Sequence, residues 1–134
     1  MPNQIVVAGA LISGSSLLVA QRDRPPDLAG LWELPGGKVA AGESDATALA
    51  RELHEELGVD VAVGSRIGAD VALNATTTLR AYRVTQTGGD LHPNDHRALR
   101  WVGVDELAAL PWVPADREWL PELAHALGRP TRLL

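Results

Sequence analysis

The sequence GKVAAGESDATALARELHEELGV, residues 37–59, contains the pattern that decides the fold of this chain. Its leucines recur at every fourth position, at Leu49, Leu53 and Leu57. This spacing predicts a helix over residues 44–57 with one apolar face turned toward a core. Ser44 is a suitable N-cap for that helix, and Gly58 is suited to end it.

The same helix carries three glutamates on one side, at Glu52, Glu55 and Glu56. Glu55 and Glu56 follow Glu52 by three and four residues, so the three lie on one side of the helix, roughly a quarter-turn from the leucine face. Like charges at this spacing repel by about a few tenths of a kcal/mol per pair. A hard cation such as Mg²⁺ prefers carboxylate oxygens and would remove this repulsion. One interpretation of the glutamates is therefore a metal site.

A second interpretation is an ordinary solvated acidic face, in which Arg51 pairs with Glu55 one turn away. The surrounding residues favour the metal site. Glu43 adds a fourth carboxylate before the helix, and the glycines of Pro35-Gly36-Gly37 can bring bare backbone close to a ligand. We expect this Pro-Gly-Gly segment to interrupt regular structure.

The segments on either side of the helix have the composition of strands. Before it we expect strands over 4–11 and 16–22, a loop over 24–30 and a short apolar run over 31–34. After it we expect strands over 59–63, 67–73, 76–84 and 98–102, with Gly88-Gly89 in a loop. The C-terminal part predicts a short helix over 105–109, a longer helix over 116–127 capped by Asp116, and a frayed tail over 128–134.

Strands on both sides of one central helix, with another helix near the end, predict the α+β class. A length of 134 residues fits one domain, over residues 1–134. An apolar content of 46% and a charged content of 22% are typical of a globular protein. The chain has no cysteine, which excludes disulfides and cysteine-bound zinc.

The charge and hydropathy patterns exclude further classes of function. No apolar run approaches the length of a membrane span, and no basic stretch precedes an apolar run at the start, so we expect a cytoplasmic protein. A net charge of −5 argues against a nucleic-acid polymer as partner, because such proteins need clustered cations. A small polyphosphate remains compatible with an acidic protein if metal ions mediate the contact.

The quoted stretch also resembles the motif of a known family. Gly37, five residues, Glu43, seven residues and then RELHEELGV at 51–59 are similar to the Nudix box at each of its defined positions. Nearly the whole chain looks like the short MutT-type members, with matching pieces at 20–22, 30–38 and 113–116. The resemblance implies a Nudix-type α/β/α sandwich with a central mixed β-sheet. It also implies a hydrolase that uses Mg²⁺ or Mn²⁺ to convert a nucleoside triphosphate to a monophosphate and diphosphate.

The resemblance implies roles for individual residues. Glu52, Glu55 and Glu56 would be the catalytic carboxylates that bind the metal, and Gly36 would offer its carbonyl to the same ion. Arg51 would orient the glutamates and Glu43 would form a salt bridge to the helix, while Leu53 and Val59 would anchor the helix in the core.

Other residues of the site are carried over from outside the box. Asp95, six positions before Trp101, is a candidate metal ligand or general base, and the alternative is a plain turn residue. Its neighbour His96 is expected to be a surface or loop residue. Arg22 would contact the phosphates, and Lys38 is a second candidate, the alternative for both being ordinary surface cations. The partner is thus a small-molecule nucleoside triphosphate, and we expect a monomer or a weak homodimer.

Two positions bear on the base. Bacterial MutT has a stacking Phe where Leu34 stands and a base-reading Asn where Asp116 stands. An ionised Asp only accepts hydrogen bonds, and it can accept from the N4 amino group of cytosine. We therefore predict CTP, dCTP or 5-methyl-dCTP as the substrate. The carboxylate could equally accept from guanine N1–H and N2–H or from N7–H of 8-oxoguanine, which makes 8-oxo-dGTP the alternative.

Two other classes of function are alternatives to a triphosphate hydrolase. A non-catalytic nucleotide-sensing module would show eroded glutamates and a fused effector domain, and neither is seen in this sequence. Hydrolysis of dinucleoside polyphosphates or nucleotide sugars is a further alternative, although the sugar-type enzymes typically carry an extra N-terminal dimerisation region.

Overall fold

The computed structural model of the chain describes residues 3–128. Its strands are β1 (Gln4–Ser13), β2 (Ser16–Gln21), β3 (Trp32–Glu33), β4 (Gly36–Lys38), β5 (Val59–Asn74), β6 (Thr77–Gly89) and β7 (Ala98–Val102). Its helices are α1 (Asp45–Leu57), the 3₁₀ helices η1 (Val104–Ala109) and η2 (Pro114–Trp119), and α2 (Leu120–Ala126). The predicted tail lies, apart from Gly128, outside the described residues.

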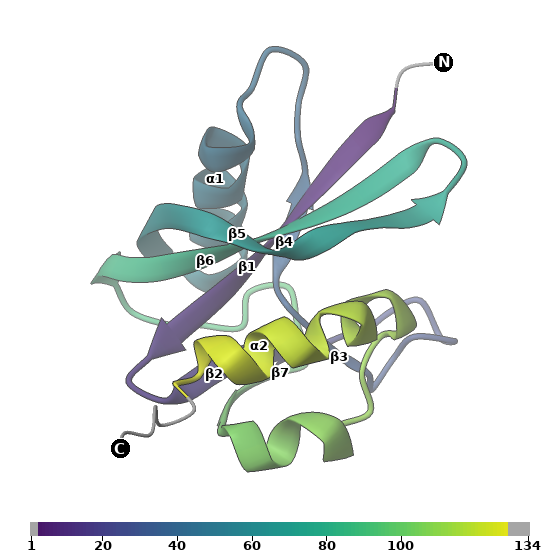
Figure 1. Cartoon of the computed structure of the whole chain (residues 1–134). Coiled ribbons are helices and arrows are strands. Elements are labelled where there is room, and N and C mark those ends of the chain that lie inside the picture. Colours follow the sequence, from purple (N-terminus) through teal and green to yellow (C-terminus); the bar gives the residue numbers. More distant parts are fainter. Residues whose placement is uncertain (1–2, 129–134) are drawn as a thin grey trace.

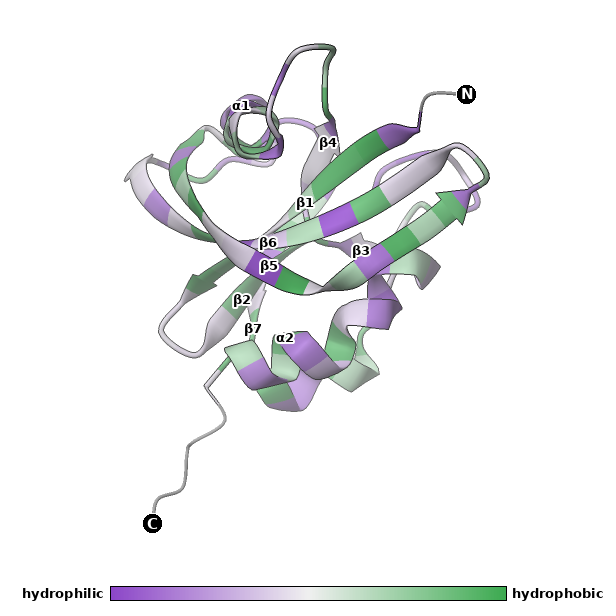
Figure 2. Ribbon diagram, turned by 45° about the horizontal axis from the view of Figure 1, so that its top comes forward, coloured by the Kyte–Doolittle hydropathy of each residue, from purple (hydrophilic) through white to green (hydrophobic). Residues whose placement is uncertain are grey.

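The strands form one mixed sheet in the order β3-β2-β1-β6-β5 (Figure 1). In addition, β4 pairs with β1 and β7 pairs with β2. The pairing of β1 with β6 is parallel, whereas the other pairings are antiparallel. Figure 2 shows α1 and α2 on opposite sides of the sheet. The predicted α/β/α sandwich with a central mixed sheet is therefore confirmed.

Each face of the sheet buries its own apolar layer. The layer under α1 contains Val7, Leu11 and Leu18 of the sheet and the leucine stripe of the helix. The layer on the other face packs Leu17, Val19 and Val102 against Trp119, Leu123 and Leu127. Because strand side chains alternate between the faces, Leu17 and Leu18 serve different layers. In the described part of the chain, no helix has the length and apolar character needed to cross a membrane.

The central helix α1 begins and ends as its sequence predicts. The Ser44 hydroxyl accepts a hydrogen bond from the Thr47 amide at 3.1 Å, which satisfies one of the free N–H groups of the first turn. Gly58 ends the helix in the left-handed conformation, with φ of 75°. The predicted anchors Leu53 and Val59 are fully buried. The caps and the apolar face therefore fix which side of α1 is left to carry the glutamates.

Two sequence predictions about strands were wrong. Residues 59–63 and 67–73 belong to one bent strand, β5, whose irregular register against β6 broke the alternation on which the prediction depended. Gly88 and Gly89 lie at the end of β6 and not in a loop. A Cβ atom at Gly89 would overlap the Gly58 carbonyl, so the close approach of β5 and β6 there requires glycine.

The Pro35-Gly36-Gly37 segment interrupts regular structure at Pro35, as expected, but its two glycines lie in a strand, contrary to expectation. Gly36 and Gly37 form most of β4 and pair with Ala8 and Val7 of β1. A Cβ atom at Gly36 would overlap the Val7 carbonyl oxygen, so only glycine can lie this close to β1. The glycines therefore allow β4 to run beside β1 instead of turning the chain away.

The predicted helix over 116–127 is also corrected. A 3₁₀ helix, η2, precedes the shorter helix α2, and Asp116 lies inside η2 instead of capping a helix. Its side chain instead accepts a hydrogen bond from the Leu34 amide at 2.8 Å. The proline at 114 begins η2, and this η2–α2 unit covers the face of the sheet opposite α1.

Candidate active site

A polar pocket of about 110 Å³ lies where α1, β4 and the ends of β2 and β3 meet. It is lined by Arg22, Asp23, Arg24, Glu33, Gly36, Glu56, Asp95 and His96. Four of these were predicted from the sequence, and they come from four separate segments of the chain. The fold therefore brings Arg22, Gly36, Glu56 and Asp95 together around one small space.

Glu56 is the carboxyl group most strongly affected by this environment. Burial, reinforced by the nearby charges of Glu52, Asp95 and Glu33, raises the pKa of Glu56 to about 8. Its Oε1 atom is buried, and no described residue forms a hydrogen bond with it. A half-buried acid whose buried oxygen has no partner is costly unless a ligand completes its environment. A cation is the ligand that would favour its ionised form.

Glu52 is held against the bare backbone of β4. A Cβ atom at Gly37 would overlap the Glu52 carboxylate, so the glycine provides the space that this side chain occupies. The Glu52 side chain is 17% exposed, and its Oε2 lies 3.1 Å from Arg51 Nη1. Glu52 therefore lies beside Glu56 on the side of α1 that faces β4.

Arg51 forms the ion pairs on which its predicted role in orienting the glutamates depends. Its guanidinium pairs with Glu43 at 2.7 Å and more distantly with Glu55 at 3.4 Å, besides Glu52. The hydrogen bonds from Arg51 and the Ala40 amide lower the pKa of Glu43 to about 2. Glu43 thus forms the predicted salt bridge to the helix, and Arg51 joins the loop before α1 to the glutamates.

The residues present fit a divalent cation, although they are not gathered around one point. Within residues 3–128, no three His, Asp or Glu side chains are grouped closely enough to hold a metal ion as they stand. Glu55 is 58% exposed and pairs with Arg51, whereas Glu56 faces the polar pocket. Mg²⁺ requires hard oxygen donors. The unsatisfied oxygen of Glu56 is one such donor, and Glu52 and Gly36 can supply others.

A second pocket, of about 330 Å³, adjoins the first and is mostly apolar. Its walls include Leu34 and Asp116, the two residues predicted to bear on the base, together with Lys38. Arg22, Glu33 and Gly36 line both pockets and so mark their junction. A molecule with a flat apolar end and a charged end would match this pair of pockets.

Asp116 is the one charged side chain among the buried residues of the described chain, with 4% exposure. Burial raises its pKa to about 7, and the hydrogen bond from the Leu34 amide opposes that shift. This hydrogen bond uses Oδ2 and ties η2 to the segment that joins β3 to β4. Asp116 therefore both anchors the wall of the apolar pocket and presents a carboxyl group to it.

Two residues of the junction were missed or misjudged from the sequence. His96, expected to be a surface or loop residue, does lie in the loop before β7, but its side chain is only 6% exposed and lies 2.9 Å from Glu33. Glu33 also pairs with Arg22 at 3.0 Å. Glu33 lies in the segment over 30–38 that resembles the MutT-type members, which was the available signal. Nothing in the sequence near Glu33 or His96 indicates that the two side chains meet. Asp95 is half-exposed, pairs with Arg24 at 2.9 Å and faces the pocket of Glu56.

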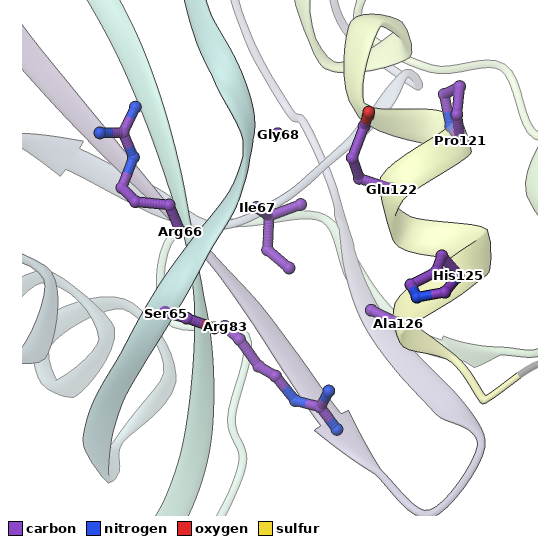
Figure 3. Close-up of a pocket in the computed structure, with 9 residues that line it drawn as sticks. All are labelled: Ser65, Arg66, Ile67, Gly68, Arg83, Pro121, Glu122, His125 and Ala126. Atoms are coloured by element: carbon purple, nitrogen blue, oxygen red, sulfur yellow. The ribbon is translucent and has the colours of Figure 1, made fainter.

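A larger hollow, of about 430 Å³, lies away from these residues between β5, β6 and α2 (Figure 3). Ile67 points toward α2 in this view, whereas Arg66 points away from it. The Arg66 guanidinium instead lies over the ring of Tyr82, 5.6 Å from its centroid. None of the predicted site residues lines this hollow, so its size does not make it the site of the chemistry.

The raised pKa values predict how stability changes with pH in the metal-free protein. Glu56 and Asp116 keep their protons in the folded state at pH values where the unfolded chain releases them. Their stabilising contribution is present below about pH 4 and is lost as the pH rises toward 8, by about 1.4 kcal/mol per group and pH unit. Glu43 has the opposite sign, but its pKa lies below this range.

The two groups together lose about 5 kcal/mol of stability between pH 5.5 and pH 8, so we expect the metal-free protein to melt about 15–25 °C lower at pH 8. Calorimetry in the presence of EDTA measures this difference directly. Glu56→Gln is the matched variant, because it removes one titrating group and should flatten the dependence. A Tm that is equal or higher at pH 8 would contradict the burial of these two acids.

Comparisons with known proteins bear on this geometry. The model of the NUDIX domain family matches residues 3–123. A Mycobacterium tuberculosis protein named "Putative 8-oxo-dGTP diphosphatase 2" is 64% identical over 131 residues, which cover 96% of this chain and 93% of that protein. The CTP pyrophosphohydrolase of Escherichia coli K12 is 39% identical over 113 residues, covering 83% of this chain and 84% of that protein.

Solved structures show the same architecture. The solution structure of the E. coli ORF135 protein aligns with a TM-score of 0.81 and 33% identity, covering 98% of this chain and 96% of that one. The crystal structure of a MutT NUDIX hydrolase from Burkholderia pseudomallei gives a TM-score of 0.76 and 28% identity, with coverage of 91% and 98%. The likeness therefore includes the η2–α2 unit as well as the central sheet.

Proposed function

This chain belongs to the Nudix family as a MutT-like hydrolase of phosphorus anhydrides, and from that premise we propose 8-oxo-dGTP as its preferred substrate. The products would be 8-oxo-dGMP and diphosphate. The observation that carries the substrate proposal is the 64% identity to the mycobacterial protein over nearly the whole of both chains. The adjoining pockets support the reaction, because one suits a base and the other suits charged phosphates.

The polar pocket supplies groups for the phosphate end of the substrate. Arg22 stands at the junction, where its guanidinium can bind phosphate oxygens in the fork geometry that suits them. Glu52 and Glu56 would hold Mg²⁺, with Mn²⁺ as the alternative, and Gly36, which lines the same pocket as Glu56, would offer its carbonyl. When bound, such an ion offsets phosphate charge and lowers the pKa of the attacking water. Asp95 faces the same pocket and is a candidate acceptor for the proton that this water releases.

The apolar pocket supplies groups for the base. Leu34 offers an apolar surface in place of an aromatic ring, and Asp116 offers a carboxyl group whose Oδ2 is already used by the Leu34 amide. The other oxygen can accept from N7–H, a donor that 8-oxoguanine has and guanine lacks. This difference gives Asp116 a physical means of distinguishing the oxidised base.

Our sequence-based preference for cytosine nucleotides is thus less well supported than its alternative. It depended on the expected pairing of Asp116 with the cytosine amino group, and that pairing remains chemically feasible. The 39% identity to the CTP pyrophosphohydrolase keeps CTP and dCTP as a second candidate class. The two candidates share the reaction and the phosphate site, so they differ only in the base pocket.

The experiment that tests the proposal is a panel of nucleoside triphosphates compared by kcat/KM with Mg²⁺. The panel contains 8-oxo-dGTP, dGTP, dCTP, 5-methyl-dCTP and CTP. We expect 8-oxo-dGTP to have the highest kcat/KM, with dGTP well below it. A higher kcat/KM for dCTP or CTP would identify the cytosine nucleotides as the preferred substrates. No turnover of any triphosphate would refute the proposed reaction.

We predict that Asp116→Asn lowers kcat/KM for 8-oxo-dGTP by about 10–100-fold, because a pocket-facing acceptor becomes a donor. The Asn carbonyl can still accept from the Leu34 amide, so the anchor of η2 is kept. The matched measurement is dGTP turnover, which should fall less, so the preference for the oxidised base narrows. Equal losses for all nucleotides in the panel would restrict Asp116 to its anchoring role.

A further inference from the structure

The junction of the two pockets contains a chain of three side chains. The carboxylate of Glu33 receives Arg22 Nη1 at its Oε1, at 3.0 Å, and meets His96 Nε2 at its Oε2, at 2.9 Å. An ionised carboxylate can only accept hydrogen bonds, so Nε2 is the donating nitrogen of His96. Each oxygen of Glu33 therefore has its own donor, and the orientation of the carboxylate is fixed from both sides.

The sheet holds these three residues in place through their main chains. Arg22 directly follows β2, Glu33 ends β3, and His96 lies two residues before β7. Both β3 and β7 pair with β2 at Gln21, so the flanking segments converge on Arg22. The backbone of Arg22 is further fixed by Leu31, whose carbonyl accepts from its amide at 2.8 Å.

Exposure increases along the chain of contacts. The side chain of His96 is 6% exposed, that of Glu33 is 15% exposed, and that of Arg22 is 31% exposed. The innermost member exposes little of its side chain to the polar pocket that it lines, whereas the outermost lines both pockets. Arg22 uses Nε and Nη1 for Arg24 and Glu33, so its Nη2 group is left to meet a ligand.

We propose that His96 is a positioning residue, which fixes the Glu33 carboxylate and through it aims the Arg22 guanidinium at the substrate phosphates. This inference rests on the proposed function, because it takes Arg22 as the phosphate-binding cation. Without the donor at Nε2, Glu33 keeps only one of its two partners and can rotate. Arg22 then loses the fixed geometry on which fork-like binding of phosphate oxygens depends.

The first experiment compares His96→Leu with His96→Gln. The Leu variant should raise KM for the best triphosphate of the panel by about tenfold and leave kcat within about threefold, because loss of a charge-assisted hydrogen bond weakens binding by that order. The Gln variant has an amide donor of similar reach, so its KM should lie close to the wild-type value. Equal losses in both variants would overturn the positioning role.

The alternative is that His96 acts on Glu56, which lines the same polar pocket. That role predicts a fall in kcat with KM unchanged, and such a result would overturn our proposal. Calorimetry distinguishes either role of His96 from a folding defect. The Tm of a variant that only loses positioning should stay within a few degrees of the wild-type value. If His96→Leu does not fold, His96→Asn replaces it, because its polar side chain is too short to reach Glu33.

A double-mutant cycle with Arg22→Ala tests the route through Arg22. If His96 acts only through that guanidinium, His96→Leu should not raise KM further when Arg22 is absent. Additive effects on KM would reject the proposed route.

A binding measurement separates this inference from the proposed function. Calorimetric titration of the EDTA-treated protein with the same nucleotide should show the tenfold weaker Kd in His96→Leu without any turnover. Lack of triphosphate hydrolysis by the wild type would refute the proposed function. By contrast, an active wild type with an unchanged KM and Kd in His96→Leu would refute only the positioning role.

Discussion

Replacing Glu56 by glutamine is expected to lower kcat by about 10³-fold or more while the protein stays folded. Glutamine has the same shape but cannot become an anion, so the polar pocket loses the group that would hold Mg²⁺. Steady-state hydrolysis of the best triphosphate, measured over a range of Mg²⁺ concentrations, gives the effect. Glu52→Gln should act in the same direction.

The same substitution should have the opposite effect on stability. Burial raises the pKa of Glu56 to about 8, so the folded state opposes its ionisation at neutral pH. Glu56→Gln removes that cost and should raise the Tm of the metal-free protein at pH 8. Glu118→Gln, at an exposed position of η2, is the matched control and should change neither quantity. Wild-type turnover in Glu56→Gln would show that this carboxylate takes no part in catalysis.

Replacing Gly37 by alanine is expected to lower kcat by about 100-fold with little change in Tm. The added Cβ would overlap the Glu52 carboxylate, which can move because it is the end of a flexible side chain. A displacement of about 1 Å in a catalytic group is enough for a loss of this size. Turnover and calorimetry on the same preparation distinguish the two effects.

The neighbouring glycine provides the contrast. In Gly36→Ala the added Cβ would overlap the Val7 carbonyl oxygen, which belongs to the backbone of β1 and cannot move alone. We expect this variant to lose the pairing of β4 with β1 and to unfold at a much lower temperature. If Gly37→Ala instead keeps full activity, then the position of the Glu52 carboxylate against β4 has no part in catalysis.

Local patterns in the sequence were sufficient to predict α1 and the glutamates on it. The leucine spacing, Ser44 and Gly58 act within one helix, so their consequences can be derived without knowing the fold. The overall α/β/α arrangement was implied by the family resemblance and is confirmed. The strand β4 was not predicted, because glycines that usually mark turns here permit a close approach to β1.

Contacts between distant segments were beyond reach from the sequence. The Asp116 carboxylate meets the Leu34 amide across 82 positions, so the local pattern around Asp116 suggested a helix cap, and only the family resemblance placed it near Leu34 at the base. His96 was expected to be a surface or loop residue, and it does lie in a loop. Its burial against Glu33 results from the pairing of β2 with both β3 and β7, which no local pattern encodes.

The parallel pairing of β1 with β6 has a consequence for how the protein is made. Gln4 pairs with Thr77, and the pairing continues to Leu11 and Val84. The central strand β1 therefore cannot complete its pairing until β6 has been synthesised. Contacts of such long sequence separation slow folding, because the intervening chain must be ordered before they form. On the ribosome, β4 and α1 emerge well before β6 and lack a complete sheet to pack on. We therefore expect the emerging chain to need protection from aggregation until residue 89 has left the exit tunnel.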